Sequence, residues 1–142
     1  MLYLGTRDDQ PIQNSAELSV EAVAPKADAV RQWFSSPVIR FVAAYRGCSC
    51  GFNYVIAEEP IACDAGTLLY PSDEEEQAVM RTLFALIQRH VVAGEVEMYP
   101  VWDGEERLPP KGTIELVATQ LDPRTFFFNE RFFYRVSSAA GR

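Results

Sequence analysis

The sequence has few of the residues on which most catalytic and metal-binding sites are built. Its 142 residues include a single histidine, His90, and only three cysteines, which excludes two- and three-histidine zinc centres. It contains no Gly-x-x-x-x-Gly-Lys phosphate loop, no Gly-x-Gly-x-x-Gly turn and no Gly-x-Ser-x-Gly nucleophile elbow. The standard nucleotide-binding loops and the serine hydrolase signature are therefore absent, and the sequence gives little support for an enzyme.

Basic residues are also scarce, and no hydrophobic run is long. Thirteen Lys and Arg residues face twenty Asp and Glu residues, for a net charge of −7 and a pI near 4.7. Because nucleic-acid binders normally carry a basic surface, we expect no nucleic-acid partner. No run approaches the roughly 20 apolar residues that cross a bilayer, and residues 1–5 are too few for a signal-peptide core. We expect no membrane association and a cytoplasmic protein.

Acidic residues are concentrated in two parts of the chain. Seven acids and no base lie between residues 58 and 76, and five acids and no base lie between residues 95 and 106. From Arg124 onward the sign reverses. An acidic surface attracts cationic partners, although the same charge can simply keep a small protein soluble.

The overall composition is typical of one globular domain, which we expect to span residues 1–142. Hydrophobic residues make up 48% and charged residues 23%, near the globular average. Residues 73–92 predict a long helix, because Ser72 and Glu75 form a capping box and apolar residues recur at helical spacing before Gly94. These apolar residues are Val79, Leu83, Leu86, Ile87 and Val91.

The other expected elements are mainly strands. Alternating or short apolar patterns indicate strands over 1–5, 18–24, 38–46, 53–57, 95–102, 113–119 and 125–136. We expect 53–57 to pair with 38–46 across a turn at 47–51, and Pro100 to mark an edge strand. Pro25 begins a shorter helix through about residue 34. The fold class is α+β: an antiparallel sheet with one long helix packed on a face and a second, shorter helix.

The most unusual local feature is the turn Gly47-Cys48-Ser49-Cys50-Gly51-Phe52. Three interpretations compete: two small buried thiols that pack at a strand end, a zinc site completed by Cys63, His90 or Asp64, or a redox-active pair of Cys48 and Cys50. A single Cys-x-Cys without a second cysteine pair is weak evidence for zinc. We expect packing and no cofactor.

Two other places carry candidate site residues. His90 lies within the apolar stripe of the helix, either as a ligand or base that faces a pocket or as a core-edge histidine bonded to a backbone group. The turn Trp102-Asp103-Gly104-Glu105-Glu106 offers the carboxylates of Asp103, Glu105 and Glu106 to a hard cation or to acid–base chemistry. Its simpler interpretation is a solvated hairpin loop.

Three motifs in order resemble a family of small bacterial proteins. They are Gly47-Cys48-x-Cys50-Gly51-Phe52, Trp102-Asp103-Gly104-Glu105-Glu106 and Phe126-Phe127-Phe128-Asn129-Glu130-Arg131. The resemblance spans roughly residue 40 to the C-terminus. It implies a stand-alone bacterial cytosolic domain with a shared fold, and it implies no activity. Val101 stands where we expect a cysteine beside the tryptophan, which weakens a metal-cluster interpretation.

Our leading hypothesis is a non-enzymatic domain that binds a protein or a small ligand. The alternative is a zinc or thiol-redox site centred on Cys48-Ser49-Cys50. If the two thiols only pack, replacing both with alanine should cost on the order of 1–2 kcal/mol of stability. We expect purified protein to be metal-free, with three titratable thiols after unfolding without reductant. A metal-to-protein ratio near one, with melting lowered by a chelator, would favour zinc instead.

Overall fold

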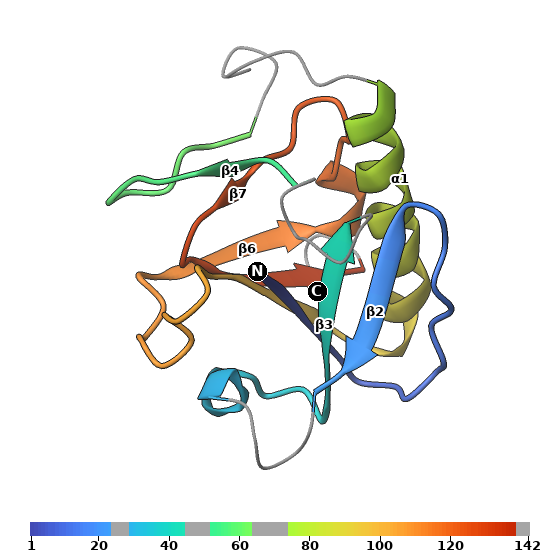
Figure 1. Cartoon of the computed structure of the whole chain (residues 1–142), viewed down its shortest axis with the longest axis horizontal. Helices are drawn as coiled ribbons and strands as arrows, with labels where there is room; N and C mark the ends of the chain where they lie inside the picture. The colour runs from blue at the N-terminus through green and yellow to red at the C-terminus, as the bar shows by residue number, and fades with distance from the viewer. Residues whose placement is uncertain (24–28, 45–51, 64–73, 139–142) are drawn as a thin grey trace.

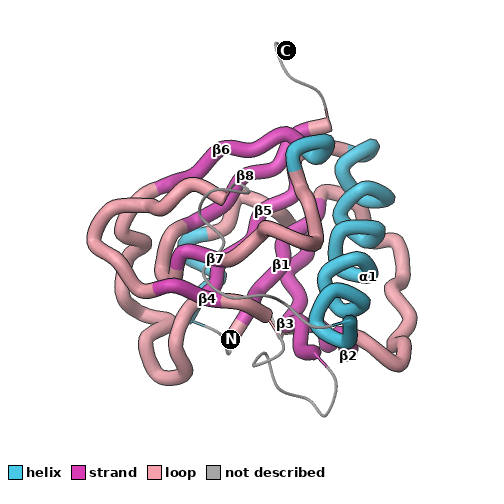
Figure 2. Tube along the Cα trace, turned by 90° about the horizontal axis from the view of Figure 1, so that it is seen from above, coloured by secondary structure: helices cyan, strands magenta, loops and turns pink. Residues whose placement is uncertain are grey.

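The computed structural model describes residues 1–23, 29–44, 52–63 and 74–138 as a mixed six-stranded sheet with one long helix against a face (Figures 1 and 2). The strand order is β2-β3-β1-β5-β8-β6. This arrangement confirms the predicted α+β class. The strands are β1 (Leu2–Thr6), β2 (Leu18–Ala22), β3 (Val38–Ala44), β5 (Val96–Pro100), β6 (Thr113–Val117) and β8 (Phe133–Ser137).

The long helix α1 (Glu74–His90) covers one face of this sheet and forms the main core with it. It begins with three glutamates, which favour the positive end of the helix dipole; Ser72 lies outside the described residues. A 3-10 turn, η5 (Val91–Ala93), follows. Gly94 has φ 149° and lies so close to Arg7 that an added Cβ would be 2.6 Å from its Cγ, so only glycine fits the end of the helix. Among the described helices, none is long and apolar enough to span a bilayer.

A second, smaller core lies on the opposite face of the sheet. It contains Tyr3, Val30, Ile39, Tyr99, Val101 and Phe133. The predicted second helix is only partly supported here, because the described residues contain a five-residue 3-10 segment, η1 (Ala29–Trp33), and residues 24–28 lie outside the description. The fully buried Glu97 fixes the chain after η1. Its carboxylate accepts hydrogen bonds from the backbone N–H and hydroxyl groups of both Ser35 and Ser36, which compensates for the buried charge.

The sheet is not wholly antiparallel, contrary to the prediction. β6 and β8 run parallel, because residues 118–132 pass through the 3-10 turn η6 (Ala118–Gln120) and β7 (Phe128–Asn129) before β8 begins. A parallel pair requires a crossover of this length. The edge prediction for β5 is also wrong, since β5 lies between β1 and β8. Pro100 is tolerated as its last residue, where its carbonyl accepts a hydrogen bond from Arg131 N–H at 2.7 Å.

The aromatic segment 125–136 forms two strands rather than the single strand we predicted. A tight turn separates β7 from β8, with Phe132 N–H bonded to the Asn129 carbonyl at 3.2 Å and Arg131 at φ 64°. The turn folds β7 back over β8, so that the ring of Phe128 lies 5.7 Å from that of Tyr134. The partner of β7 is β4 (Tyr54–Val55), in parallel, so the predicted pairing of 53–57 with 38–46 is also wrong.

The buried face of α1 generates a direct test. Leu83 is fully buried, so Leu83→Ala should lower the free energy of unfolding by about 2–5 kcal/mol through lost apolar burial and the cavity left behind. Arg81 lies on the exposed face and pairs with Glu74 at 3.1 Å, so Arg81→Ala should cost at most about 0.5 kcal/mol. Urea denaturation measures both values, and equal stability of the two variants would contradict the assigned helix face.

Candidate ligand-binding cavities

The predicted cysteine and histidine candidates do not form one cluster in the part of the chain that the structure describes. Cys48 and Cys50 lie outside the described residues. Cys63 is half-buried, and its Sγ lies 3.1 Å from the Phe127 carbonyl and 3.4 Å from the Phe127 N–H. His90 is fully buried beside Asp8. Within the described ranges, no three His, Cys, Asp or Glu side chains are placed to hold a metal ion.

His90 has a different partner from the one we predicted. Its Nδ1 lies 2.5 Å from Asp8 Oδ1, so a carboxylate rather than a backbone group orients the ring. Its Nε2 has no hydrogen-bond partner among the described residues. The histidine therefore links the end of α1 to the segment after β1.

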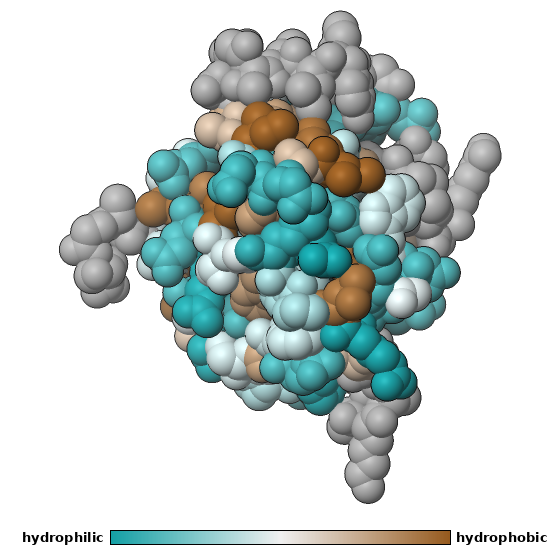
Figure 3. Space-filling model, turned by 90° about the vertical axis from the view of Figure 1, so that its left-hand side faces the viewer, coloured by the Kyte–Doolittle hydropathy of each residue, from teal (hydrophilic) through white to brown (hydrophobic). Residues whose placement is uncertain are grey.

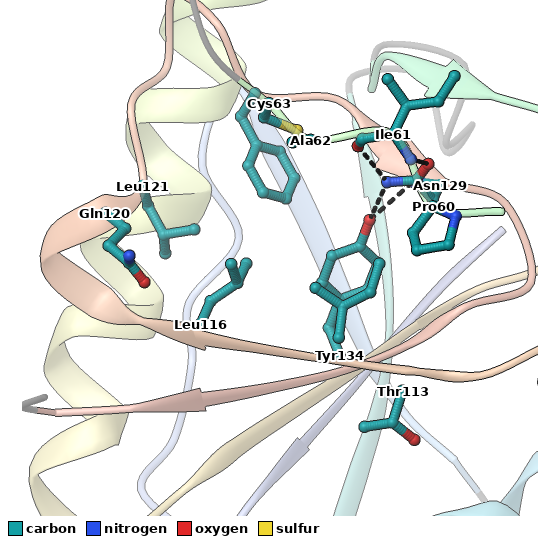
Figure 4. Close-up of a pocket in the computed structure, with 12 residues that line it drawn as sticks. Pro60, Ile61, Ala62, Cys63, Thr113, Leu116, Gln120, Leu121, Asn129 and Tyr134 are labelled. Atoms are coloured by element: carbon teal, nitrogen blue, oxygen red, sulfur yellow. Dashed lines mark hydrogen bonds between the residues drawn. The ribbon is translucent and has the colours of Figure 1, made fainter. Parts of the chain in front are cut away.

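A cavity lies between residues 60–63, strand β6 and the segment before β7 (Figure 4). Its volume is about 450 Å³, within the usual range of small-molecule sites. Most of its wall is apolar. The apolar contributors include Ile61, Ile114, Leu116, Leu121 and Phe126.

The side chain of Asn129 holds the upper wall of this cavity in place. Its Oδ1 accepts the Ile61 N–H at 2.7 Å, and its Nδ2 donates to the Ile61 carbonyl at 3.0 Å. The Tyr134 hydroxyl accepts hydrogen bonds from Asn129 N–H at 2.7 Å and from Nδ2 at 3.2 Å. Figure 4 shows these three residues bonded together at one side of the cavity. The clamp attaches residues 60–63 to the sheet across nearly seventy residues of sequence.

The polar side chains that line the cavity are few and include no acid, lysine, arginine or histidine. They are those of Cys63, Thr113, Gln120, Asn129 and Tyr134. Gln120 Oε1 already accepts the Val117 N–H at 2.8 Å. Burial raises the pKa of Tyr134 to about 12, although the hydrogen bonds from Asn129 oppose this shift. At neutral pH the phenol is therefore uncharged, and the described lining carries no formal charge.

The acidic turn from Trp102 to Glu106 lies at a second, smaller cavity. Trp102 is 53% exposed, Asp103 is exposed, and Glu105 and Glu106 are half-buried. The Trp33 indole N–H donates to the Glu106 carbonyl at 3.0 Å, and Glu106 Oε2 accepts the Gly104 N–H at 3.0 Å. The turn is thus fixed against η1, with Glu106 also bonded to the backbone of the turn itself.

This second cavity has a volume of about 40 Å³ and is lined by Met1, Tyr54, Val101, Trp102 and Glu130. Glu130 is only 5% exposed. Burial raises its pKa, whereas a hydrogen bond from the Trp102 backbone and the nearby Lys111 ammonium lower it. The structure therefore places Trp102 beside a buried carboxylate that does not belong to the acidic turn.

Sequence reasoning named Cys63 and Trp102, which line the two cavities, but missed the other residues that define them. Asn129, Glu130 and Tyr134 belong to a segment read as a single aromatic strand, and Ile61 belongs to a segment read only as loop. Asn129 and Glu130 are polar residues within a run of aromatic residues, which is a signal that a buried polar group needs a partner. The identity of that partner depends on contacts between distant segments.

Comparison of the chain with protein-family models, with curated proteins and with solved structures found no match in any of the three.

Two buried tyrosines predict a loss of stability at alkaline pH. Burial raises the pKa of both Tyr99 and Tyr134 to about 12, above the ordinary value of about 10. Their contribution to stability is therefore complete below about pH 10 and is lost as the pH rises toward 12, because the unfolded state releases these protons first. By about pH 11.5 the loss should be roughly 2 kcal/mol per tyrosine.

Urea denaturation at about pH 9 and about pH 11.5 measures this loss. Tyr134→Phe removes one of the two groups, so the variant should lose less stability over this interval than the wild-type protein. Equal alkaline losses in the two proteins would contradict the shifted pKa of Tyr134.

Proposed function

We propose that the protein is a non-enzymatic binding domain that holds a small, neutral and largely apolar molecule in the 450 Å³ cavity. The observation that carries this proposal is a preformed apolar cavity whose wall is fixed by the Asn129 clamp. Small-molecule sites typically combine an apolar lining with a few polar groups that orient the ligand. A wall held before binding also lowers the entropy cost of association.

The lining supports a neutral ligand rather than a charged one. The described residues around the cavity include no lysine, arginine or carboxylate, so a buried ionic group would have no counter-charge. The polar side chains of the lining include the Cys63 thiol and the Thr113 hydroxyl. An alcohol or ketone with a hydrocarbon body fits this chemistry better than a carboxylate or a phosphate.

The same lining supports binding rather than catalysis. A general acid or base needs a group that exchanges a proton near neutral pH within reach of the ligand. Of the titratable groups in the lining, Tyr134 has its pKa raised to about 12 and the Cys63 thiol already contacts the Phe127 backbone. His90 is engaged with Asp8 and does not line the cavity. The zinc or thiol-redox alternative depends on Cys48 and Cys50, which the thiol and metal assay above tests directly. A cytosolic setting, and a relationship to small bacterial proteins that carry the same cysteine turn, are part of this proposal.

Ligand binding can be tested with N-phenyl-1-naphthylamine, a neutral dye that fluoresces in apolar surroundings. We expect saturable fluorescence and displacement by decanol. Decanoate at pH 8 should compete at least about tenfold more weakly, because a carboxylate would be buried without a counter-charge. Leu116→Trp, which fills the cavity, should weaken dye binding by at least about tenfold.

The matched control places the same residue on the surface. Val92 is 83% exposed and does not line the cavity, so Val92→Trp should bind the dye like the wild-type protein. Dye binding that is unchanged in Leu116→Trp, or equally reduced in both variants, would overturn the assignment of the cavity. Stronger competition by decanoate than by decanol would overturn the proposed ligand class.

A further inference from the structure

The small cavity beside Trp102 contains a buried acid that protein contacts satisfy only in part. Glu130 lines the cavity and is more than nine-tenths buried. Its Oε1 has no hydrogen-bond partner in the described part of the chain. At about 40 Å³ the cavity exceeds the roughly 10–15 Å³ that one water needs, so it can receive a group as small as an ammonium.

The positive charges around Glu130 do not fully neutralise the negative charge at the cavity. Lys111 Nζ lies 3.9 Å from Glu130 Oε2, but it donates its hydrogen bond to the Ala57 carbonyl at 3.1 Å. Arg131 and the Met1 ammonium also interact with this carboxylate, whereas the nearby Glu105 adds negative charge. The negative field at the cavity is therefore compensated only in part.

The Met1 ammonium lies at the cavity wall, so its pKa responds to this negative field. It donates to the Val101 carbonyl at 2.7 Å. Burial lowers its pKa, whereas Glu106, Asp103 and Glu130 all act to raise it. Carboxylates of the acidic turn and of the buried site thus favour positive charge at the same place.

Two aromatic residues complete the cavity wall. Tyr54 belongs to β4, and the half-exposed Trp102 follows β5. β4 lies on the side of the molecule that faces the viewer in Figure 3, where separate hydrophobic patches interrupt a mostly hydrophilic surface. Aromatic faces attract cations through their quadrupoles. A carboxylate next to aromatic rings is therefore suited to binding an organic cation.

We propose that this cavity binds a primary alkylammonium group, such as the end of a lysine side chain of a partner. Glu130 supplies the counter-charge, Tyr54 and Trp102 supply the aromatic wall, and Asp103, Glu105 and Glu106 attract the approaching cation. A divalent metal ion fits less well, because no three potential ligands converge in the described residues. An anion would be repelled. This site is separate from the apolar cavity and does not depend on the ligand proposed there.

The proposal can be tested with n-butylammonium, which reproduces the end of a lysine side chain. In an ¹H–¹⁵N NMR titration of the intact protein at constant ionic strength, the Trp102 and Glu130 amides should shift saturably, in the millimolar range expected of a ligand with few atoms. Neutral n-butanol should not produce these shifts. Glu130→Gln keeps the shape but removes the charge, and it should weaken binding by at least about tenfold.

Two further variants separate the site from a general charge effect. Trp102→Ala changes an exposed residue and should weaken butylammonium binding by roughly threefold. Glu115→Gln removes an exposed charge on β6 and should leave binding unchanged. If Glu130→Gln does not fold, the comparison of butylammonium with butanol on wild-type protein, together with Trp102→Ala, decides the question. Absence of saturable shifts, equal shifts with butanol, or full binding by Glu130→Gln or Trp102→Ala would each overturn the proposal.

Discussion

The hydrogen bonds of Asn129 are the constraint on which the rest of the binding surface depends. A single amide side chain satisfies both backbone groups of Ile61, and the Tyr134 hydroxyl satisfies the backbone N–H of Asn129 itself. These groups are buried or partly buried, so each unmade bond would cost about 1–3 kcal/mol. Without the clamp, Ile61 would lose both of its hydrogen bonds to Asn129, and the contacts of Cys63 with Phe127 would have to hold this wall of the larger cavity.

The short segment around β7 also separates the apolar cavity from the acidic one. Asn129 and Glu130 are neighbours in sequence, and neighbouring residues of an extended chain point to opposite sides. Asn129 therefore faces the apolar cavity, and Glu130 faces the small acidic one. The left-handed backbone of Arg131 then reverses the chain into β8. A ligand in one cavity and a cation in the other would contact adjacent residues of one segment.

Local patterns in the sequence predicted where the helix and strands lie better than they predicted which strands pair with each other. The helix of residues 73–92 and the strands around 1–5, 38–46 and 95–102 were predicted correctly to within a few residues, because capping, periodicity and alternation are local properties. The partner of β4, the parallel pairing of β6 with β8 and the break at Arg131 were not predicted, since they depend on contacts between distant segments. Of the candidate site residues, Trp102 borders a cavity with Glu130 and Cys63 borders the other, but Asn129, Tyr134 and Glu130 were not foreseen as site residues.

The central position of β1 has a consequence for how the protein folds during synthesis. β1, which precedes the other described strands along the chain, pairs on one side with β3 and on the other with β5, where Leu2 lies opposite Pro100. The nascent chain can form β1, β2 and β3 early, but the second edge of β1 remains unpaired until β5 has been translated. A sheet dominated by such distant pairings folds more slowly than a helical protein of equal size. Its exposed strand edge is vulnerable to aggregation during that interval.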